Sequence, residues 1–255
     1  VLLECGAKTL HSWAGVGRMS KRDKDVLKRA ATHAQTVKNW TNVDVLFVDE
    51  VSMMTQRLFE LLNRMGQVAR SECARPFGGV QVVFTGDFFQ LPPVCTAAAC
   101  SAKESASCFE SPQWDEVFPL QVELQRVYRQ KDRAFVKMLH QVRRGRISQK
   151  TYDTLLSRVR ATPPDTFEPP EIVPRKQQAD DHNADRLAAL SAPPRTYTYR
   201  PWQDNEYLRN HGVTYDQQTT WSRRMERNDA AQPVKLAVGA QVMCRANIDV
   251  EAGVC

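Results

Sequence analysis

The chain has 255 residues, of which 42% are hydrophobic and 25% charged, so it holds enough apolar material for one large or two ordinary domains. This composition excludes a disordered tail, and its short apolar runs exclude a membrane-spanning helix. The net charge is only +6, with seven scattered cysteines and no Cys-x-x-Cys pair. We therefore expect an intracellular protein with reduced thiols, and the absence of a signal pattern at Val1 to Cys5 agrees.

The charge is unevenly distributed. From Arg126 to Arg160 there are eleven basic and two acidic residues, a local balance of +9, so the remainder carries about −3. Such clustering is typical of a segment that binds a polyanion. The alternative interpretation is that these basic residues form a solvated helix face without a polyanion partner.

The first predicted element is a buried parallel strand over Val45 to Val48, which runs into Asp49 and Glu50. Thr55 is predicted to cap a helix whose apolar residues follow the three-four spacing of one helix face, namely Leu58, Leu61, Leu62, Met65, Val68 and Ala69. A second buried strand is predicted over Val80 to Thr85. Two strands separated by a helix predict a βαβ unit and a parallel sheet.

The small, polar residues from Thr96 to Ser107 predict a surface loop, and the three cysteines Cys95, Cys100 and Cys108 lack zinc-ligand spacing. A helix is predicted with one apolar face formed by Phe135, Met138, Leu139 and Val142. A shorter helix is predicted from Thr151 to Val159.

Paired prolines at 163–164 and 169–170 predict a linker and a domain boundary. Beyond them we expect a strand near Ile172 and Val173, a helix around Asp180 to Leu190, and an apolar stretch from Val238 to Cys244. These elements predict the beginning of another α/β unit.

Two acids at the end of a buried strand stand where open α/β sheets bind ligands. In ATPases with a phosphate-binding loop, the first acid serves the Mg²⁺ ion and the second polarises the attacking water. Asp49 and Glu50 fit these roles, although many folds end a strand in acids by chance. After the second strand, Gln90 lies between Gly86 and the pair Pro92-Pro93 and can bond a phosphate or its attacking water. A turn with a solvated Gln90 is the alternative.

Several segments, in order, resemble the petite integration frequency (PIF) family of superfamily one DNA helicases, relatives of RecD. The segment from Asp49 to Met53 resembles the family's Walker B motif. The segments from Pro76 to Gly79 and from Gly86 to Val94 are nearly diagnostic. Further similar segments are Thr9–Gly17, Phe109–Trp114, Leu124–Gln130 and Val238–Asn247.

The resemblance implies a role for each matching residue. Asp49 would hold Mg²⁺, Glu50 would be the catalytic base, and Gln90 would be a catalytic sensor that also binds ATP. Arg129 would reach the γ-phosphate, for which a planar guanidinium is suited; a surface arginine is the alternative. Thr9, His11 and Ser12 would face DNA, although a buried structural His11 is also open, and Trp13 either stacks on a base or fills the core.

The basic segment adds Arg143, Arg144 and Arg146 as expected DNA contacts. Nothing in the sequence matches the phosphate-binding pattern Gly-x-x-x-x-Gly-Lys-Ser/Thr, which in the family lies just before the position of Val1. We therefore expect a fragment of a longer protein, cut at both ends, that hydrolyses no ATP by itself.

The implied fold is α/β, with RecA-like (P-loop NTPase) parallel sheets that carry helices on both faces. The first RecA-like domain would cover residues 1–127, a basic helical insertion with its Pro-rich linker 128–168, and a truncated second RecA-like domain 169–255.

The implied activity is an ATP- and Mg²⁺-dependent 5′-to-3′ DNA helicase that acts on single strands and on forked or structured duplexes. Its expected processes are DNA repair, recombination and telomere or genome maintenance, in the nucleus or the mitochondrion. Two alternatives are a single-stranded DNA-binding relic without hydrolysis and the motor module of a relaxase or recombination complex.

Overall fold

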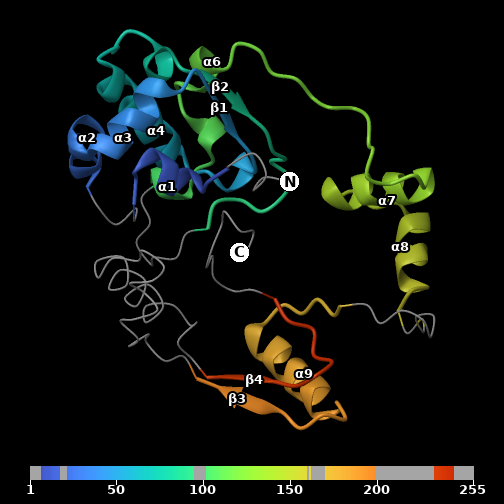
Figure 1. The fold of residues 1–255 in the computed structure, drawn as a ribbon. Helices are drawn as coiled ribbons and strands as arrows, with labels where there is room; N and C mark the ends of the chain where they lie inside the picture. The colour runs from blue at the N-terminus through green and yellow to red at the C-terminus, as the bar shows by residue number, and fades with distance from the viewer. Residues whose placement is uncertain are drawn as a thin grey trace. The chain divides into compact units, whose positions relative to one another are not determined.

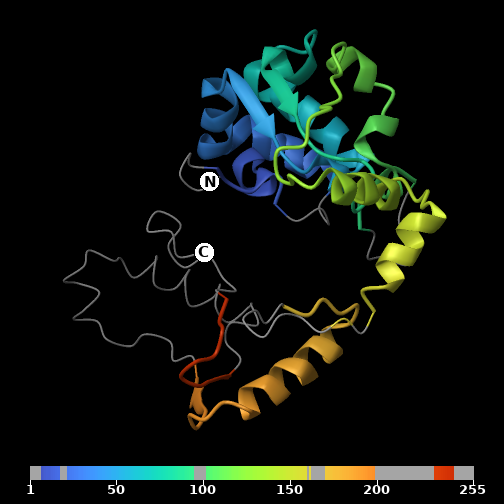
Figure 2. The ribbon, with the colours of Figure 1, turned by 90° about the vertical axis from the view of Figure 1, so that its right-hand side faces the viewer.

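The computed structural model describes residues 7–17, 22–94, 102–159, 161, 170–198 and 233–243 (Figure 1). Its described residues up to 161 form one compact unit, and those from 170 on belong to another. Figure 2 shows the same ribbon from the side. Within these ranges no helix is long and apolar enough to cross a membrane.

The first unit is built on a βαβ element. Strands β1 (Val45–Val48) and β2 (Gln81–Phe84) are parallel, with Val45 opposite Gln81 and Val48 opposite Phe84. Helix α4 (Gln56–Arg70) connects them, and the Thr55 hydroxyl accepts a hydrogen bond from the amide of Leu58 at 3.1 Å. The predicted strand, helix, cap and parallel pairing are confirmed, with β2 one residue shorter at each end. The prediction that the second strand is buried is wrong, because Gln81 is exposed and the other three residues of β2 are only partly buried.

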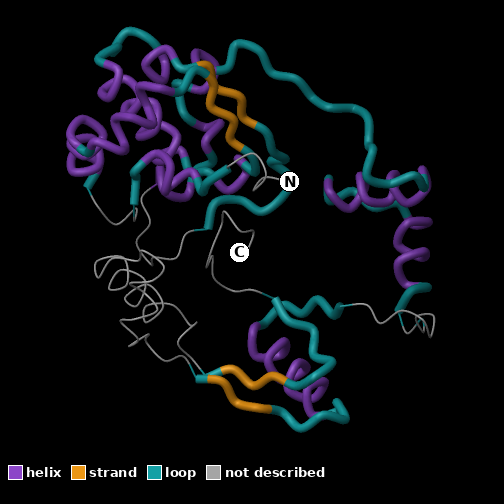
Figure 3. Tube along the Cα trace, viewed as in Figure 1, coloured by secondary structure: helices purple, strands orange, loops and turns teal. Residues whose placement is uncertain are grey.

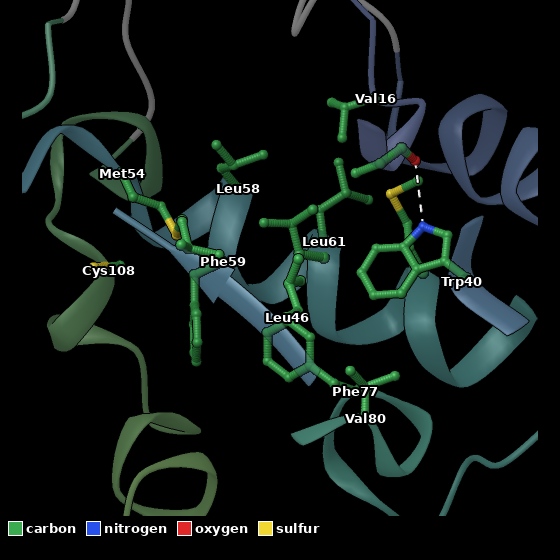
Figure 4. Close-up of a cluster of buried hydrophobic side chains, with 14 of the residues drawn as sticks. Val16, Trp40, Leu46, Met54, Leu58, Phe59, Leu61, Phe77, Val80 and Cys108 are labelled. Carbon is green, nitrogen blue, oxygen red and sulfur yellow. Dashed lines mark hydrogen bonds between the residues drawn. The ribbon is translucent and has the colours of Figure 1, made fainter. Parts of the chain in front are cut away.

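The prediction that β1 is buried on both faces is wrong. Leu46 and Val48 are buried, whereas Val45 is exposed and Phe47 is 72% exposed. Leu46 and Val48 join the core that α4 supplies through Phe59, Leu62 and other apolar residues. Figure 4 shows Leu46 and Phe59 within this core. Among the described residues this core covers only one side of β1, so alternate side chains face solvent.

Three helices precede the sheet: α1 (Leu10–Ala14), α2 (Asp23–Thr32) and α3 (Ala34–Asn42). The Trp40 indole donates to the carbonyl of Ala14 at 3.3 Å, and the Asn39 amide donates to the carbonyl of Trp13 at 2.7 Å. The rings of Trp13 and Trp40 lie 4.9 Å apart. Of the two predicted roles for Trp13, the structure shows the packing role, and α1 is thereby fixed on α3.

The segment Pro76–Gly79 (η2) forms a turn that packs closely on α4. The buried Phe77 adopts a left-handed conformation, with φ at 51°, and its amide donates to the Asn63 side chain at 2.6 Å. A Cβ atom at Gly66 would lie 2.5 Å from the carbonyl oxygen of Phe77, and one at Gly78 would overlap the backbone of Gly66. The motif therefore fixes the path of the chain from α4 into β2.

Shorter elements follow: η1 (Val51–Met53), α5 (Ala102–Ser105), η3 (Cys108–Glu110) and α6 (Trp114–Val117). The predicted loop from Thr96 to Ser107 thus contains a helical turn, while its first part lies outside the described residues. In α5, Lys103 forms an ion pair with Glu60 of α4 at 2.6 Å.

The basic segment contains α7 (Arg133–Arg143) and α8 (Gln149–Leu156), which confirms both predicted helices. The apolar face of α7 is partly open, since Phe135, Leu139 and Val142 are all exposed. Both helices fall in the same compact unit as the βαβ element. The predicted separate insertion over 128–168 stays a prediction.

The second unit contains α9 (Lys176–Ala188) and the antiparallel strands β3 (Arg195–Tyr197) and β4 (Val234–Leu236), as Figure 3 shows. The helix predicted around Asp180 to Leu190 is confirmed, but it both begins and ends earlier than predicted. The predicted strand at Ile172 is wrong, because this residue is 96% exposed and lies outside any strand. Residues 238–243 form turn and coil, whereas Cys244, Asn247 and the prolines at 163, 164 and 169 lie outside the described residues.

Candidate functional site

The carboxyl ends of β1 and β2 meet and are tied together by the main chain. The amide of Thr85 donates to the carbonyl of Val48 at 2.8 Å, and the amide of Val51 donates back to the carbonyl of Thr85 at 3.1 Å. A Cβ atom at Gly86 would lie 2.9 Å from the nitrogen of Val51, so only glycine fits this crossing. The two predicted ligand-binding segments therefore leave the sheet side by side.

Asp49 is held at this edge by two hydrogen bonds. Its Oδ1 atom accepts from the Thr85 hydroxyl at 2.5 Å and from the amide of Glu50 at 2.9 Å. The described structure gives Oδ2 no hydrogen-bond partner, so a carboxylate oxygen faces an exposed edge. Carboxylate and hydroxyl oxygens are the hard ligands that Mg²⁺ prefers, and Asp49 with Thr85 fits that ion.

Thr85 was not predicted as a site residue. The register of the two strands could have identified it. Thr85 directly follows β2 as Asp49 directly follows β1, and the carboxyl ends of paired parallel strands lie at the same edge of the sheet.

Glu50 adopts a conformation that is unusual for a residue with a side chain. Its φ and ψ are 56° and 45°, in the left-handed region. This conformation costs about 1–2 kcal/mol for a non-glycine residue, and such strain clusters at functional sites. Glu50 is exposed at the carboxyl edge, next to Asp49, as the base role requires.

The loop after β2 is organised by Asp87, a residue for which the sequence patterns predict no role. Its Oδ1 atom accepts from the amide of Phe89 at 3.1 Å, and its main-chain carbonyl accepts from the amide of Gln90 at 2.9 Å. The Gln90 side chain donates weakly to Oδ2 at 3.5 Å. Gln90 is exposed on this loop, close to the carboxyl edge.

Arg143, the last residue of α7, contacts the same loop. Its Nε and Nη2 atoms donate to the two carboxylate oxygens of Asp87, each at 2.6 Å, and its guanidinium lies 4.6 Å from the centre of the Phe89 ring. The hydrogen bonds from Arg143 hold the pKa of Asp87 down at about 2. The guanidinium of Arg143 is thus paired with a carboxylate of the same chain, and the prediction that it binds DNA phosphates stays a prediction.

Arg129, Arg144 and Arg146 were also predicted as site residues. Arg129 lies in an exposed segment between α6 and α7, and the structure records no hydrogen bond or ion pair that brings it to Asp49 or Gln90. Arg144 and Arg146 are exposed at the end of α7. The predicted roles of all three stay predictions.

The predicted DNA-facing residues of the first segment share an exposed surface. Thr9, His11 and Ser12 are all exposed, at the start of and within α1. The alternative of a buried structural His11 is therefore wrong. Because Trp13 anchors α1 to α3, these three side chains are held on a fixed support.

The cysteine cluster forms no site within the described residues. Cys108 is buried, and burial raises the pKa of its thiol to about 11, so the group stays protonated. The described ranges hold no group of three or more potential metal ligands. Cys95 and Cys100 lie outside them.

Comparison with known proteins shows likeness to one group. The model of the PIF1-like helicase family matches residues 1–153. The ATP-dependent DNA helicase PIF1 of Saccharomyces cerevisiae is 32% identical over 246 residues, which are 96% of this chain and 27% of that protein. The chain thus spans about a quarter of this relative's length.

Solved structures agree. The Pif1 helicase of Candida albicans has a TM-score of 0.75 at 29% identity and covers 98% of this chain and 53% of its own. A Bacteroides Pif1 bound to single-stranded DNA has a TM-score of 0.58 at 25% identity, over 77% of this chain and 46% of its own. These likenesses confirm the predicted RecA-like α/β fold.

Proposed function

We propose that this chain, which belongs to the PIF1-like helicase family, is the part of an ATP-dependent DNA helicase that carries its water-activating acid and a share of its DNA contacts. The observation that supports this most is the carboxyl edge of β1 and β2. There the Asp49–Thr85 pair, the strained Glu50 and the loop of Gln90 lie together.

The chemistry follows from the geometry of this edge. A bound Mg²⁺ ion would neutralise charge on the nucleotide phosphates. Thr85 and the amide of Glu50 both donate to Oδ1 of Asp49 and so orient its carboxylate for such an ion. The Glu50 carboxylate accepts a proton from the attacking water, and Gln90 donates to the γ-phosphate or to that water. Arg129 is proposed to stabilise the charge that develops on the γ-phosphate.

DNA contact is proposed for two exposed sets of residues. Thr9, His11 and Ser12 offer short donors to phosphate oxygens, and Arg144 and Arg146 offer positive charge. The single-stranded DNA in the Bacteroides relative supports this choice of partner. Forked or structured duplexes would be the substrates, and the proposed processes are DNA repair, recombination and telomere or genome maintenance in the nucleus or mitochondrion.

The proposed direction of movement is 5′ to 3′ along the bound strand. In the intact protein that contains this chain, we expect ATP and Mg²⁺ to drive separation of a duplex with a single-stranded 5′ tail. A duplex of the same sequence with a 3′ tail of equal length should stay paired, because the motor then moves away from the junction. Strand separation is followed with a fluorophore and quencher pair. Preferential opening of the 3′-tailed duplex would contradict the proposed direction.

A further inference from the structure

The ion pair between Arg143 and Asp87 joins parts of the chain that are 56 residues apart. Both donors of the guanidinium fork are used, each at 2.6 Å, and the Phe89 ring covers the guanidinium at 4.6 Å. Bidentate, charge-assisted pairs of this kind are stronger and more directional than ordinary surface ion pairs. The side chains are only 30% and 20% exposed, so solvent screens them less than it screens a fully exposed pair.

The carboxylate that Arg143 holds is the one that shapes the Gln90 loop. Asp87 accepts the amide of Phe89 with Oδ1 and the amide of Gln90 with its carbonyl. A rotation of the Asp87 side chain would release Phe89 and the weak contact to the Gln90 side chain. The position of Gln90 thus depends on Asp87, whose carboxylate is bound by Arg143 of α7.

The other end of this connection is the turn between α7 and α8. The Gln141 side-chain oxygen accepts from the amide and hydroxyl of Ser148 and from the hydroxyl of Thr151, at 3.0, 3.1 and 2.6 Å. These bonds lock the turn that carries Arg144 and Arg146 onto the last residues of α7. Arg143 is therefore fixed to the element that presents the exposed arginines.

We propose that Arg143 is a positioning residue for Gln90, and that it ties the Gln90 loop to the α7–α8 turn by holding Asp87. When Arg144 and Arg146 contact DNA, the Arg143–Asp87 pair would transmit this contact to Gln90 and so change the rate of ATP hydrolysis. The effect on ATP hydrolysis rests on the proposed function, whereas the ordering of the Gln90 loop by Arg143 does not. The competing role for Arg143 is a direct phosphate contact, which would require the bidentate pair to break.

The first measurement is hydrogen exchange of the amides of Phe89 and Gln90, which requires no ATP hydrolysis. In Arg143→Gln we expect exchange at these amides to rise about tenfold, because the glutamine amide cannot replace a charge-assisted fork. The matched control is Lys176→Gln, which removes the exposed pair of Lys176 with Asp180 on α9 and should leave both amides unchanged.

The second measurement separates positioning from DNA contact in the intact protein. At saturating single-stranded DNA, Arg143→Gln should lower kcat for ATP by about tenfold with little change in KM, since Gln90 acts in the transition state. The salt dependence of DNA binding should keep its slope. Arg144→Ala should instead reduce that logarithmic slope by about 0.7, the loss of one phosphate contact on a single strand.

The two measurements distinguish a positioning role of Arg143 from a direct phosphate contact. A slope reduced by about 0.7 in Arg143→Gln, with unchanged exchange at Phe89 and Gln90, would make Arg143 a phosphate contact and overturn the proposal. Unchanged exchange with unchanged kcat would overturn it too. If Arg143→Gln does not fold, Arg143→Lys keeps the charge without the fork and should show the same two effects in weaker form. If Glu50→Gln keeps full turnover, the proposed function fails, while hydrogen exchange still decides the positioning role.

Discussion

Replacing Glu50 with glutamine in the intact protein is expected to lower kcat for DNA-stimulated ATP hydrolysis by about 10²–10⁴-fold, with ATP affinity nearly unchanged. A glutamine side chain has almost the same shape, but its amide cannot accept the proton of the attacking water. Glutamine also tolerates the left-handed conformation at this position no worse than glutamate does. The loss should therefore report chemistry and not folding.

The matched control is Asp44→Asn. Asp44 is an exposed acid just before β1, at the opposite end of the strand that leads into Asp49 and Glu50. The same loss of one negative charge at that end should leave turnover unchanged. Steady-state and single-turnover ATP hydrolysis measure the change in turnover, and binding of a fluorescent nucleotide measures the affinity for ATP. Near-normal turnover in Glu50→Gln would remove Glu50 from the role of base.

Replacing Gly66 with alanine is expected to destabilise the first unit by about 3 kcal/mol or more. The new Cβ atom would lie 2.5 Å from the Phe77 carbonyl oxygen and 2.7 Å from its carbon, and both are backbone atoms that cannot rotate away. In an unobstructed helix the same change would stabilise by about 0.5–1 kcal/mol, so the sign of the effect tests the close contact directly.

Urea unfolding followed by circular dichroism measures this free energy. Arg64→Ala serves as the control, because Arg64 is an exposed residue two positions earlier in the same helix. Its change in stability should stay within about 0.5 kcal/mol. A neutral or stabilising Gly66→Ala would show that α4 and the Pro76–Gly79 turn do not pack as described.

The elements of the first unit follow from local sequence patterns. The apolar run at Val45, the capping hydroxyl of Thr55 and the three-four spacing of α4 each concern residues close in the chain, so local rules find them. The placement of Asp49 and Glu50 at a strand end follows from the same patterns.

What the sequence patterns missed depends on contacts between distant segments. The bond from Thr85 to Asp49 joins residues 36 apart, and the pair of Arg143 with Asp87 joins residues 56 apart. A basic run predicts a polyanion contact for every arginine in it, because composition cannot show that one of them is claimed by an internal carboxylate. The exposure of Phe47 was missed for the same reason, since a continuous apolar run does not reveal which face is covered.

A structure of the intact protein would show whether ATP is hydrolysed at the carboxyl edge of β1 and β2. It would be bound to single-stranded DNA, Mg²⁺ and ADP with aluminium fluoride, which mimics the γ-phosphate in the transition state. We expect Mg²⁺ beside Asp49, either directly at about 2 Å or through a water. We also expect the attacking water at Glu50, the fluoride within hydrogen-bond distance of Gln90, and Arg143 still paired with Asp87. A nucleotide bound away from this edge, with Asp49 and Glu50 facing solvent, would contradict the claim.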